Sequence, residues 1–154
     1  HQVSVKVEEL INEENNAGMT TINFYRGFQE HAERVKNEFL QFLIDKKTQG
    51  KLVVGYGAAA KGNTLLNFAG VKSDLIKFVV DRSPHKQGKY MPGSRIPIVS
   101  EDRLKSDKPD YVVIFPWNLS AEIAKQIGYM NALRSEFVVA IPNLCTISSA
   151  QPFK

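Results

Sequence analysis

Short apolar runs rich in valine and isoleucine recur along this chain, and they constrain its fold more than any other feature. Polar residues rarely alternate within these runs, which is typical of strands buried on both faces of a parallel sheet. Patterns typical of helices separate most of them, at residues 63–70, 101–108 and 120–134. This alternation predicts an α/β fold, Rossmann-like and doubly wound, with a mainly parallel sheet of five or six strands. The predicted strands are residues 51–57, 75–81, 96–100, 110–115 and 136–141.

The first 50 residues have a different pattern. Residues 3–18 predict a short amphipathic helix, and a long helix is expected from Thr20 or Thr21 to Gly50. One apolar stripe along the long helix is predicted to comprise Phe24, Phe28, Val35, Phe39 and Phe42. We expect residues 1–50 to be a helical lead-in that packs on the sheet of a Rossmann-like domain at 51–154. Together they would form one compact domain, the C-terminal part of a longer enzyme.

Composition narrows the classes of function. The formal net charge is only +4, with basic residues dispersed among acidic ones, so nucleic-acid binding is not expected. The single cysteine, Cys145, allows no intrachain disulfide and no cysteine-based zinc site, and it is predicted to be a small core residue. No apolar run is long enough to span a membrane. These features predict a cytoplasmic protein without a membrane partner or a metal of its own.

A glycine-alanine turn follows the first predicted strand. Gly55, Gly57 and Ala60 satisfy the pattern G-x-G-x-x-G/A between a strand and a helix, where a backbone can approach a diphosphate. Lys61 and Asn63 add side-chain donors. Alternatively, the small residues only allow the strand and the helix to pack closely. The turn is not a P-loop, because Lys61 precedes Gly62.

Two further strand ends carry candidate residues. Asp81 ends the second strand, where an acid can accept hydrogen bonds from ribose hydroxyls or close an Asx turn. Trp117 and Asn118 follow the fourth strand, and the tryptophan can stack on a base or a sugar ring, or be buried against a neighbouring domain. The loop after Asp81 carries residues that can meet phosphate or remain solvated: Arg82, His85, Lys86, Lys89 and Arg95. No nucleophile elbow or catalytic triad is recognisable.

Three segments together resemble the C-terminal domain of the sugar C-methyltransferase family, which acts on nucleotide-activated deoxysugars. They are "VVGYGAAAKGNTLLNFAGV", "FVVDRSPHKQGKYMPGSRIPIVS" and "PDYVVIFPWNLSAEI". The resemblance implies that S-adenosylmethionine, the catalytic residues and a zinc site belong to preceding domains, and that this chain alone is not catalytic. It also implies a nucleotide-sugar site shared with the catalytic domain of the same polypeptide. The substrate-binding residues we predict are Gly55, Tyr56, Gly57, Ala58, Ala60, Lys61, Gly62, Asn63, Asp81, Trp117 and Asn118.

The residues themselves agree that the methyl donor binds elsewhere. A usual S-adenosylmethionine site has an acidic residue before its glycines, whereas Val53 and Val54 precede Gly55 here. Two other functions stay open. The domain could be a non-catalytic interaction or scaffold module that uses the phenylalanine stripe, or an NAD(P)-binding oxidoreductase domain, although residues for hydride transfer are not recognisable.

Overall fold

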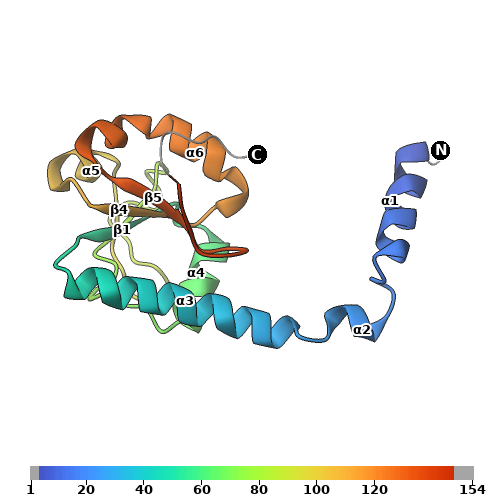
Figure 1. The fold of residues 1–154 in the computed structure, drawn as a ribbon. Coiled ribbons are helices and arrows are strands. Elements are labelled where there is room, and N and C mark those ends of the chain that lie inside the picture. Colours follow the sequence, from blue (N-terminus) through green and yellow to red (C-terminus); the bar gives the residue numbers. More distant parts are fainter. Residues whose placement is uncertain (1–3, 148–154) are drawn as a thin grey trace. The chain divides into compact units, whose positions relative to one another are not determined.

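The computed structural model describes residues 4–147, apart from the side chains of residues 131–133. The chain divides into two units, residues 1–34 and residues 35–154. The second unit contains the whole sheet (Figure 1). The predicted domains at 1–50 and 51–154 stay a prediction. No helix in the described part of the chain is long and apolar enough to cross a membrane.

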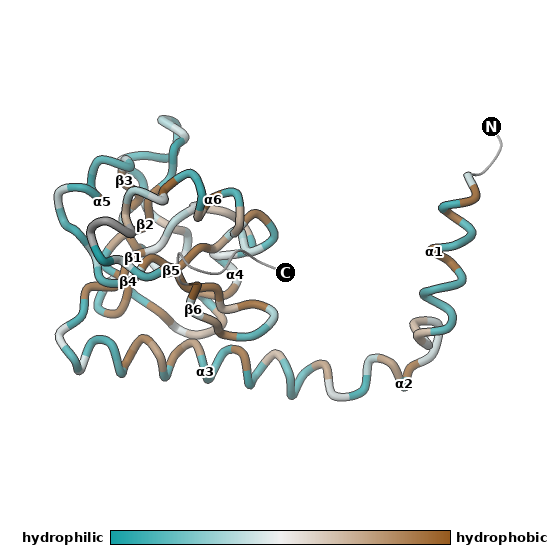
Figure 2. The backbone as a smooth tube through the Cα atoms, turned by 45° about the horizontal axis from the view of Figure 1, so that its top comes forward, coloured by the Kyte–Doolittle hydropathy of each residue, from teal (hydrophilic) through white to brown (hydrophobic). Residues whose placement is uncertain are grey.

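A six-stranded sheet in the order β3-β2-β1-β4-β5-β6 forms the centre of the second unit. Its first five strands are parallel, with Gly55 opposite Val79 on one side and Val113 on the other. These strands appear as hydrophobic segments in Figure 2. The strands are β1 (Val53–Tyr56), β2 (Val79–Val80), β3 (Ile98–Val99), β4 (Tyr111–Ile114), β5 (Glu136–Val139) and β6 (Cys145–Ile147).

Helices cover both faces of this sheet (Figure 1). On one face, the second part of α3 (Phe28–Thr48) and α4 (Ala60–Phe68) pack into a core that includes Phe39, Leu66 and Phe115. On the other face, α5 (Asp102–Asp107) and α6 (Ser120–Gln126) pack into a second core. The predicted doubly wound, mainly parallel α/β fold is therefore confirmed.

The predicted sheet of five or six strands allowed for a sixth strand, but its position was not located in the sequence. β6 pairs antiparallel with β5, and Cys145 lies opposite Val139. Cys145 is exposed, so its prediction as a core residue is wrong. An edge strand has a neighbour on one side only, so its residues need not be apolar, and this short segment lacks the apolar run that marked the other strands.

The first unit holds α1 (Val5–Asn16), α2 (Ile22–Tyr25) and the start of α3. The predicted continuous helix from Thr20 or Thr21 is interrupted after α2, where Gly27 has a φ of +85°. The prediction of a single apolar stripe is therefore wrong, because the Phe24 and Phe28 side chains are 45% and 70% exposed. Within the second unit, α3 buries Val35, Phe39 and Leu43.

Candidate functional site

The candidate site lies at the carboxyl ends of β1 and β4. The chain builds β1, β2 and β3 in one direction and then returns to place β4 on the other side of β1. This reversal is the switch point of a doubly wound sheet, where ligands bind outside the strand ends. The glycine-alanine turn follows β1 here, and the segment from Phe115 to Asn118 follows β4.

Phe115 and Pro116 explain the glycines of the turn. A Cβ atom on Gly62 would lie 2.5 Å from Cβ of Phe115, and one on Gly57 would lie 2.5 Å from Cδ of Pro116. Gly55 is also packed against the Phe115 ring. Gly57 has a φ of +87°, a conformation that side chains disfavour. Close packing alone therefore accounts for these glycines, and ligand binding must be argued from other groups.

Helix α4 begins directly after the turn with unpaired backbone donors. Its N-cap residue, Ala59, makes no side-chain cap. The first intrahelical bond runs from the Asn63 amide to the Ala59 carbonyl, at 3.0 Å. Within residues 4–147, the amides of Ala60, Lys61 and Gly62 have no acceptor. Such amides, together with the positive end of the helix dipole, favour an anion at this place.

Lys61 connects the two halves of the switch point. Its Nζ donates to Oδ1 of Asn118 at 2.8 Å and lies 5.0 Å from the ring centroid of Trp117. Trp117 is half-buried and packs partly on the core beneath α6, whereas Asn118 is exposed. Three predicted site residues from two distant segments thus lie together, although their role toward a ligand stays a prediction.

Asp81 holds the turn in place. Its Oδ2 accepts hydrogen bonds from the Ala58 amide at 2.8 Å and from Nζ of Lys86 at 3.0 Å. Its Oδ1 accepts from the Ser83 amide at 2.9 Å, which is the Asx turn considered from the sequence. Lys86 also donates to the Ala58 carbonyl at 3.0 Å. Asp81 therefore ties β2 to the glycine-alanine turn, whether or not it also accepts a ribose hydroxyl.

Tyr56 points to the other face of the sheet. Its hydroxyl donates to Oε2 of Glu101 at 3.2 Å, and the Tyr129 hydroxyl donates to Oε1 of the same carboxylate at 2.9 Å. Burial, with the nearby negative charge of Glu101, raises the pKa of Tyr56 to about 12, and the same causes raise the pKa of Tyr129. The structure thus separates the Tyr56 side chain from Lys61 and Asn63. Glu101 was not recognised in the sequence, because nothing there paired it with two distant tyrosines.

A cavity of about 400 Å³ lies on the β2 side of α4. One wall comprises Ala58–Ala60 and Asn63, and the other comprises residues from His85 to Pro92, with Ile98 completing the lining. Sequence reasoning singled out His85, Lys86 and Lys89, but it missed Tyr90 and Met91. A tyrosine directly after Lys89, in a loop rich in basic residues, was the sequence signal that could have found Tyr90.

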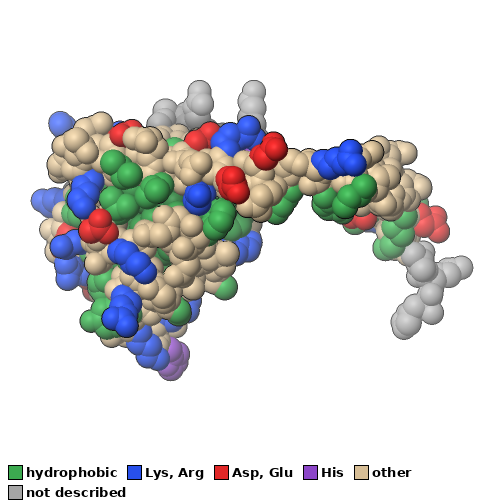
Figure 3. Space-filling model, turned by 90° about the horizontal axis from the view of Figure 1, so that it is seen from below, with side chains coloured by type: hydrophobic (Ala, Val, Ile, Leu, Met, Phe, Trp, Pro, Cys, Tyr) green, Lys and Arg blue, Asp and Glu red, His purple; other side chains and the backbone are tan. Residues whose placement is uncertain are grey.

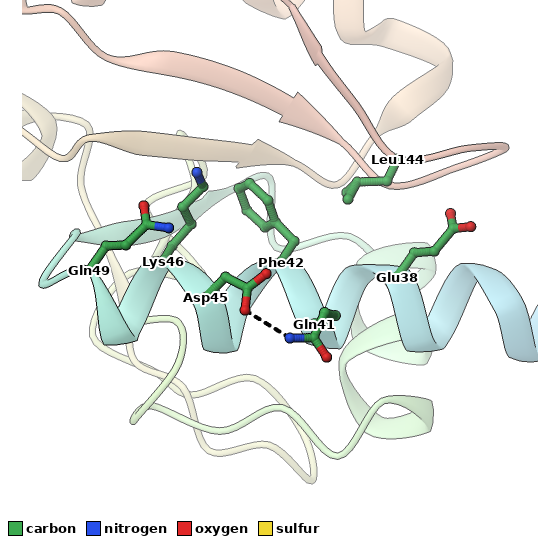
Figure 4. Close-up of a pocket in the computed structure, with 7 residues that line it drawn as sticks. All are labelled: Glu38, Gln41, Phe42, Asp45, Lys46, Gln49 and Leu144. Atoms are coloured by element: carbon green, nitrogen blue, oxygen red, sulfur yellow. Dashed lines mark hydrogen bonds between the residues drawn. The ribbon is translucent and has the colours of Figure 1, made fainter.

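A second hollow of about 430 Å³ lies along α3 (Figure 4). Its polar side chains include both charge signs, and Gln41 donates to Asp45 at 2.8 Å. Nζ of Lys46 lies 4.7 Å from the ring centroid of Tyr111. Figure 3 shows the face that carries α3, with basic side chains scattered among apolar ones over the sheet-bearing unit. Because its lining carries two carboxylates and one lysine, this hollow is the weaker candidate for an anionic ligand.

Neither side of the switch point gathers metal ligands. Among residues 4–147, no group of three or more His, Cys, Asp or Glu side chains is placed to hold a metal ion. His85 lines the cavity beside lysines, and His31 contacts Arg34, with 2.8 Å between Nδ1 and an arginine nitrogen.

Comparison with known proteins identifies the family. The C-methyltransferase C-terminal domain model matches residues 1–142. The C-methyltransferase NovU of Streptomyces niveus is 36% identical over 149 residues, which are 97% of this chain and 36% of that protein. The chain thus spans about a third of the length of this curated relative.

Among solved structures, the UDP-D-quinovosamine 4-dehydrogenase of Vibrio fischeri is similar at a TM-score of 0.49 and 20% identity. The match covers 64% of this chain and 94% of the dehydrogenase chain. The fold assignment above depends on the strand order of the chain itself. The family match over residues 1–142 confirms the resemblance found in the sequence: this chain belongs to the C-methyltransferase C-terminal domain family.

Proposed function

We propose that this chain is the nucleotide-sugar-binding C-terminal part of an S-adenosylmethionine-dependent sugar C-methyltransferase. The observation that carries the proposal is the meeting of Lys61 with Asn118 and Trp117 beside the unpaired amides of α4. A lysine, free backbone amides and an aromatic ring at one switch point suit a ligand that joins phosphates to a sugar. Family membership supports methyl transfer and leaves the oxidoreductase alternative without support.

In this proposal the diphosphate lies at the first turn of α4. The helix dipole and the amides of Ala60, Lys61 and Gly62 attract the negative charge. The Lys61 ammonium lies beside the exposed Asn118, so a phosphate oxygen can replace or join the amide oxygen as its partner. Asp81, which holds the turn through the Ala58 amide, also accepts from Lys86 and from the Ser83 amide, and these bonds reduce its repulsion of a phosphate.

The residues of this chain do not fit the methyl donor. β1 provides buried valines where a usual donor site has an acid, and Pro116 fills the space over Gly57. S-adenosylmethionine supplies the methyl group, and we place its site, the catalytic base and the zinc of the parent enzyme outside this chain. The chain itself contributes binding energy, which holds the sugar in position for a reaction that other residues catalyse.

The test is calorimetric titration of the intact enzyme with a dTDP-sugar. Lys61→Ala removes the charge at the switch point, and we expect a loss of affinity of roughly tenfold, equivalent to one charge-assisted contact. Lys77→Ala is the matched control, because Lys77 is exposed near the amino end of β2. The affinity of this variant for the dTDP-sugar should equal that of the parent. Unchanged affinity in Lys61→Ala would contradict the proposal.

A second candidate function is an interaction module without a ligand. It is favoured by the exposed apolar side chains of the first unit, among them Ile22 at 75% and Phe28 at 70% exposure. If this candidate is right, Phe28→Ser lowers the activity of the intact enzyme and leaves dTDP-sugar affinity unchanged. The Gly57→Val substitution cannot separate the two functions, because the clash with Pro116 would disturb the fold under either of them.

A further inference from the structure

The cavity on the β2 side of α4 shares the helix N-terminus with the proposed diphosphate site. Ala58, Ala59 and Ala60 line it, whereas Lys61 reaches toward Asn118 on the β4 side. A ligand whose phosphates lie at the first turn of α4 therefore has a cavity on the β2 side and the Lys61–Asn118 pair on the β4 side. The cavity has a volume of about 400 Å³, which is within the usual range for small-molecule sites.

The lining of this cavity is basic and contains no acidic residue. Lys86 and Lys89 contribute to it, and their positive charge suits the phosphate side of a ligand, while His85 adds a polar ring to the lining. Lys86 is engaged with Asp81 and the Ala58 carbonyl. Within residues 4–147, the Lys89 side chain has no hydrogen-bond or ion-pair partner, so its ammonium is available to a ligand.

Asn63 contributes an unusual polar group to the same lining. Its Oδ1 is buried and has no hydrogen-bond partner within the described part of the chain. An unpaired buried acceptor costs free energy, because water no longer solvates it and no protein donor replaces the water. Because this oxygen is buried from solvent, the Asn63 side chain must turn toward the cavity before a ligand N–H can reach the oxygen and remove that penalty.

Tyr90 completes the cavity with an aromatic ring. It is 64% exposed although it lines the cavity, so one part of the ring remains available for stacking. The loop that carries it is held in several places. Tyr90 bridges to Pro97, the Ile98 amide donates to the Lys89 carbonyl at 2.8 Å, and Asn67 donates to the Pro92 carbonyl at 2.9 Å. The ring is thus presented by an anchored loop.

We propose that this cavity binds the nucleoside of the sugar nucleotide. The base stacks on Tyr90 and donates an N–H to Oδ1 of Asn63, whose side chain turns toward the cavity on binding, while Lys89 faces the phosphates. The sugar then extends across the first turn of α4 toward Trp117. This assignment rests on the proposed function. It gives the two aromatic residues different roles: Tyr90 stacks on the base, and Trp117 contacts the sugar.

The hollow along α3 offers no comparable site. Glu38 and Asp45 line it, and they would repel phosphates. Lys46 is directed to the Phe42 and Tyr111 rings, which already occupy its cation. The β2-side cavity is therefore the better place for the nucleoside, because it combines free positive charge, an unpaired acceptor and an exposed ring.

The test is titration of the intact enzyme with thymidine diphosphate. Stacking of a base on an aromatic ring is worth about 1–3 kcal/mol, so Tyr90→Ala should weaken binding by roughly five- to 150-fold. Tyr90→Phe is the matched control and should bind nearly as the parent does, because it keeps the ring. Asn63→Leu, which keeps the size of the side chain without its polar atoms, should also weaken binding by about tenfold.

The outcomes separate this inference from the function beneath it. If Tyr90→Ala binds normally while Lys61→Ala binds weakly, the diphosphate site is right and the nucleoside site is wrong. If Trp117→Ala alone loses thymidine diphosphate affinity, the base lies at Trp117 and the inference is overturned. Thymidine diphosphate that does not bind at all overturns both. Because Tyr90 is mostly exposed, Tyr90→Ala should keep the unfolding temperature of the parent, which thermal unfolding checks.

Discussion

The two edges of the sheet differ in how many of their polar groups have hydrogen-bond partners within the chain. At the amino edge, Asp110 accepts from the Leu52 amide at 2.8 Å and from Lys51 at 2.9 Å, and Ser135 donates to the Pro109 carbonyl at 2.5 Å. At the carboxyl edge, the first amides of α4 and Oδ1 of Asn63 have no partner within residues 4–147.

This difference distinguishes groups that support the fold from groups that are available to a ligand. A buried polar group without a partner destabilises a fold, so most are paired within the chain or with water. Of the two buried side-chain atoms without a partner in the described part of the chain, Oδ1 of Asn63 lies in the first turn of α4, and Oγ of Ser94 lies in the loop before β3. The first amides of α4 lie over the tightly packed Phe115 and Pro116.

Asp81, which is paired like Asp110, and Lys61, which donates to Asn118, are exceptions at the carboxyl edge. Substitutions at the two edges should therefore have different effects on stability and on binding.

The largest effect is expected for Gly62→Ala. The added methyl would lie 2.5 Å from Cβ and Cγ of Phe115, which is itself buried and cannot move freely. Overpacking typically costs about 1–3 kcal/mol, and two contacts of 2.5 Å on a buried side chain should cost more than this range. After the gain of about 1 kcal/mol from replacing a helical glycine, the net loss should exceed about 2 kcal/mol. Denaturant unfolding should show a clear net loss.

Gly128→Ala is the matched control for this substitution, because nothing lies within 4 Å of the added methyl and its φ is not positive. Its stability should stay close to that of the parent chain. If Gly62→Ala were as stable as Gly128→Ala, close packing would not be the reason for the glycines of the turn. Their backbone freedom near a ligand would then be the remaining explanation.

Sequence periodicity was sufficient to predict the sheet. Valine-rich runs at β1, β4 and β5 are buried on both faces, so their pattern depends on local sequence alone. The break at Gly27 and the edge strand β6 were missed, because a single glycine in a helical pattern and a polar edge strand carry weak local signals.

The sequence predicted where the candidate site lies, at the turn and the strand ends, but not how its side chains are arranged. The glycine-alanine turn and the ends of β2 and β4 follow from strand positions, and the topology brings them to one edge. The reason for the glycines did not follow, because the clash with Phe115 and Pro116 joins segments that are far apart in the sequence. The sequence also did not show to which face of the sheet Tyr56 points. Its hydrogen bond to Glu101 could be found only in the structure.

A smaller effect is expected for Asp81→Ala. The substitution leaves the part-buried Ala58 amide without its acceptor and removes the ion pair with Lys86. Loss of a charge-assisted acceptor costs about 1.5–3 kcal/mol, and denaturant unfolding should show about 2 kcal/mol.

Lys86→Met is the control for the Asp81 variant, because it removes only the half-exposed partner and should cost less than about 1 kcal/mol. Nucleotide affinity measured on both variants sharpens the result. If Asp81→Ala retains stability but loses affinity, the carboxylate acts on the ligand and not on the turn.

The smallest effect is expected at the amino edge, for Asp110→Ala. Burial alone would raise the pKa of Asp110, but hydrogen bonds from the Leu52 amide and Lys51 lower it below its ordinary value. Because the folded-state pKa is depressed, this carboxylate stabilises the fold above the ordinary pKa of about 4, and the stabilisation is lost as the pH falls through the folded-state value. Since both side chains are more than one third exposed, the loss should be about 0.5–1 kcal/mol.

Two measurements decide the Asp110 prediction. Denaturant unfolding between pH 7 and pH 2 should show that the parent loses more stability on acidification than Asp110→Ala does, so that the two curves converge at low pH. Nucleotide affinity at pH 7 should be the same in both, because the substituted pair lies at the amino ends of β1 and β4, away from α4. A loss of affinity in this variant would mean that the amino edge also influences the site, and the separation of the two edges would fail.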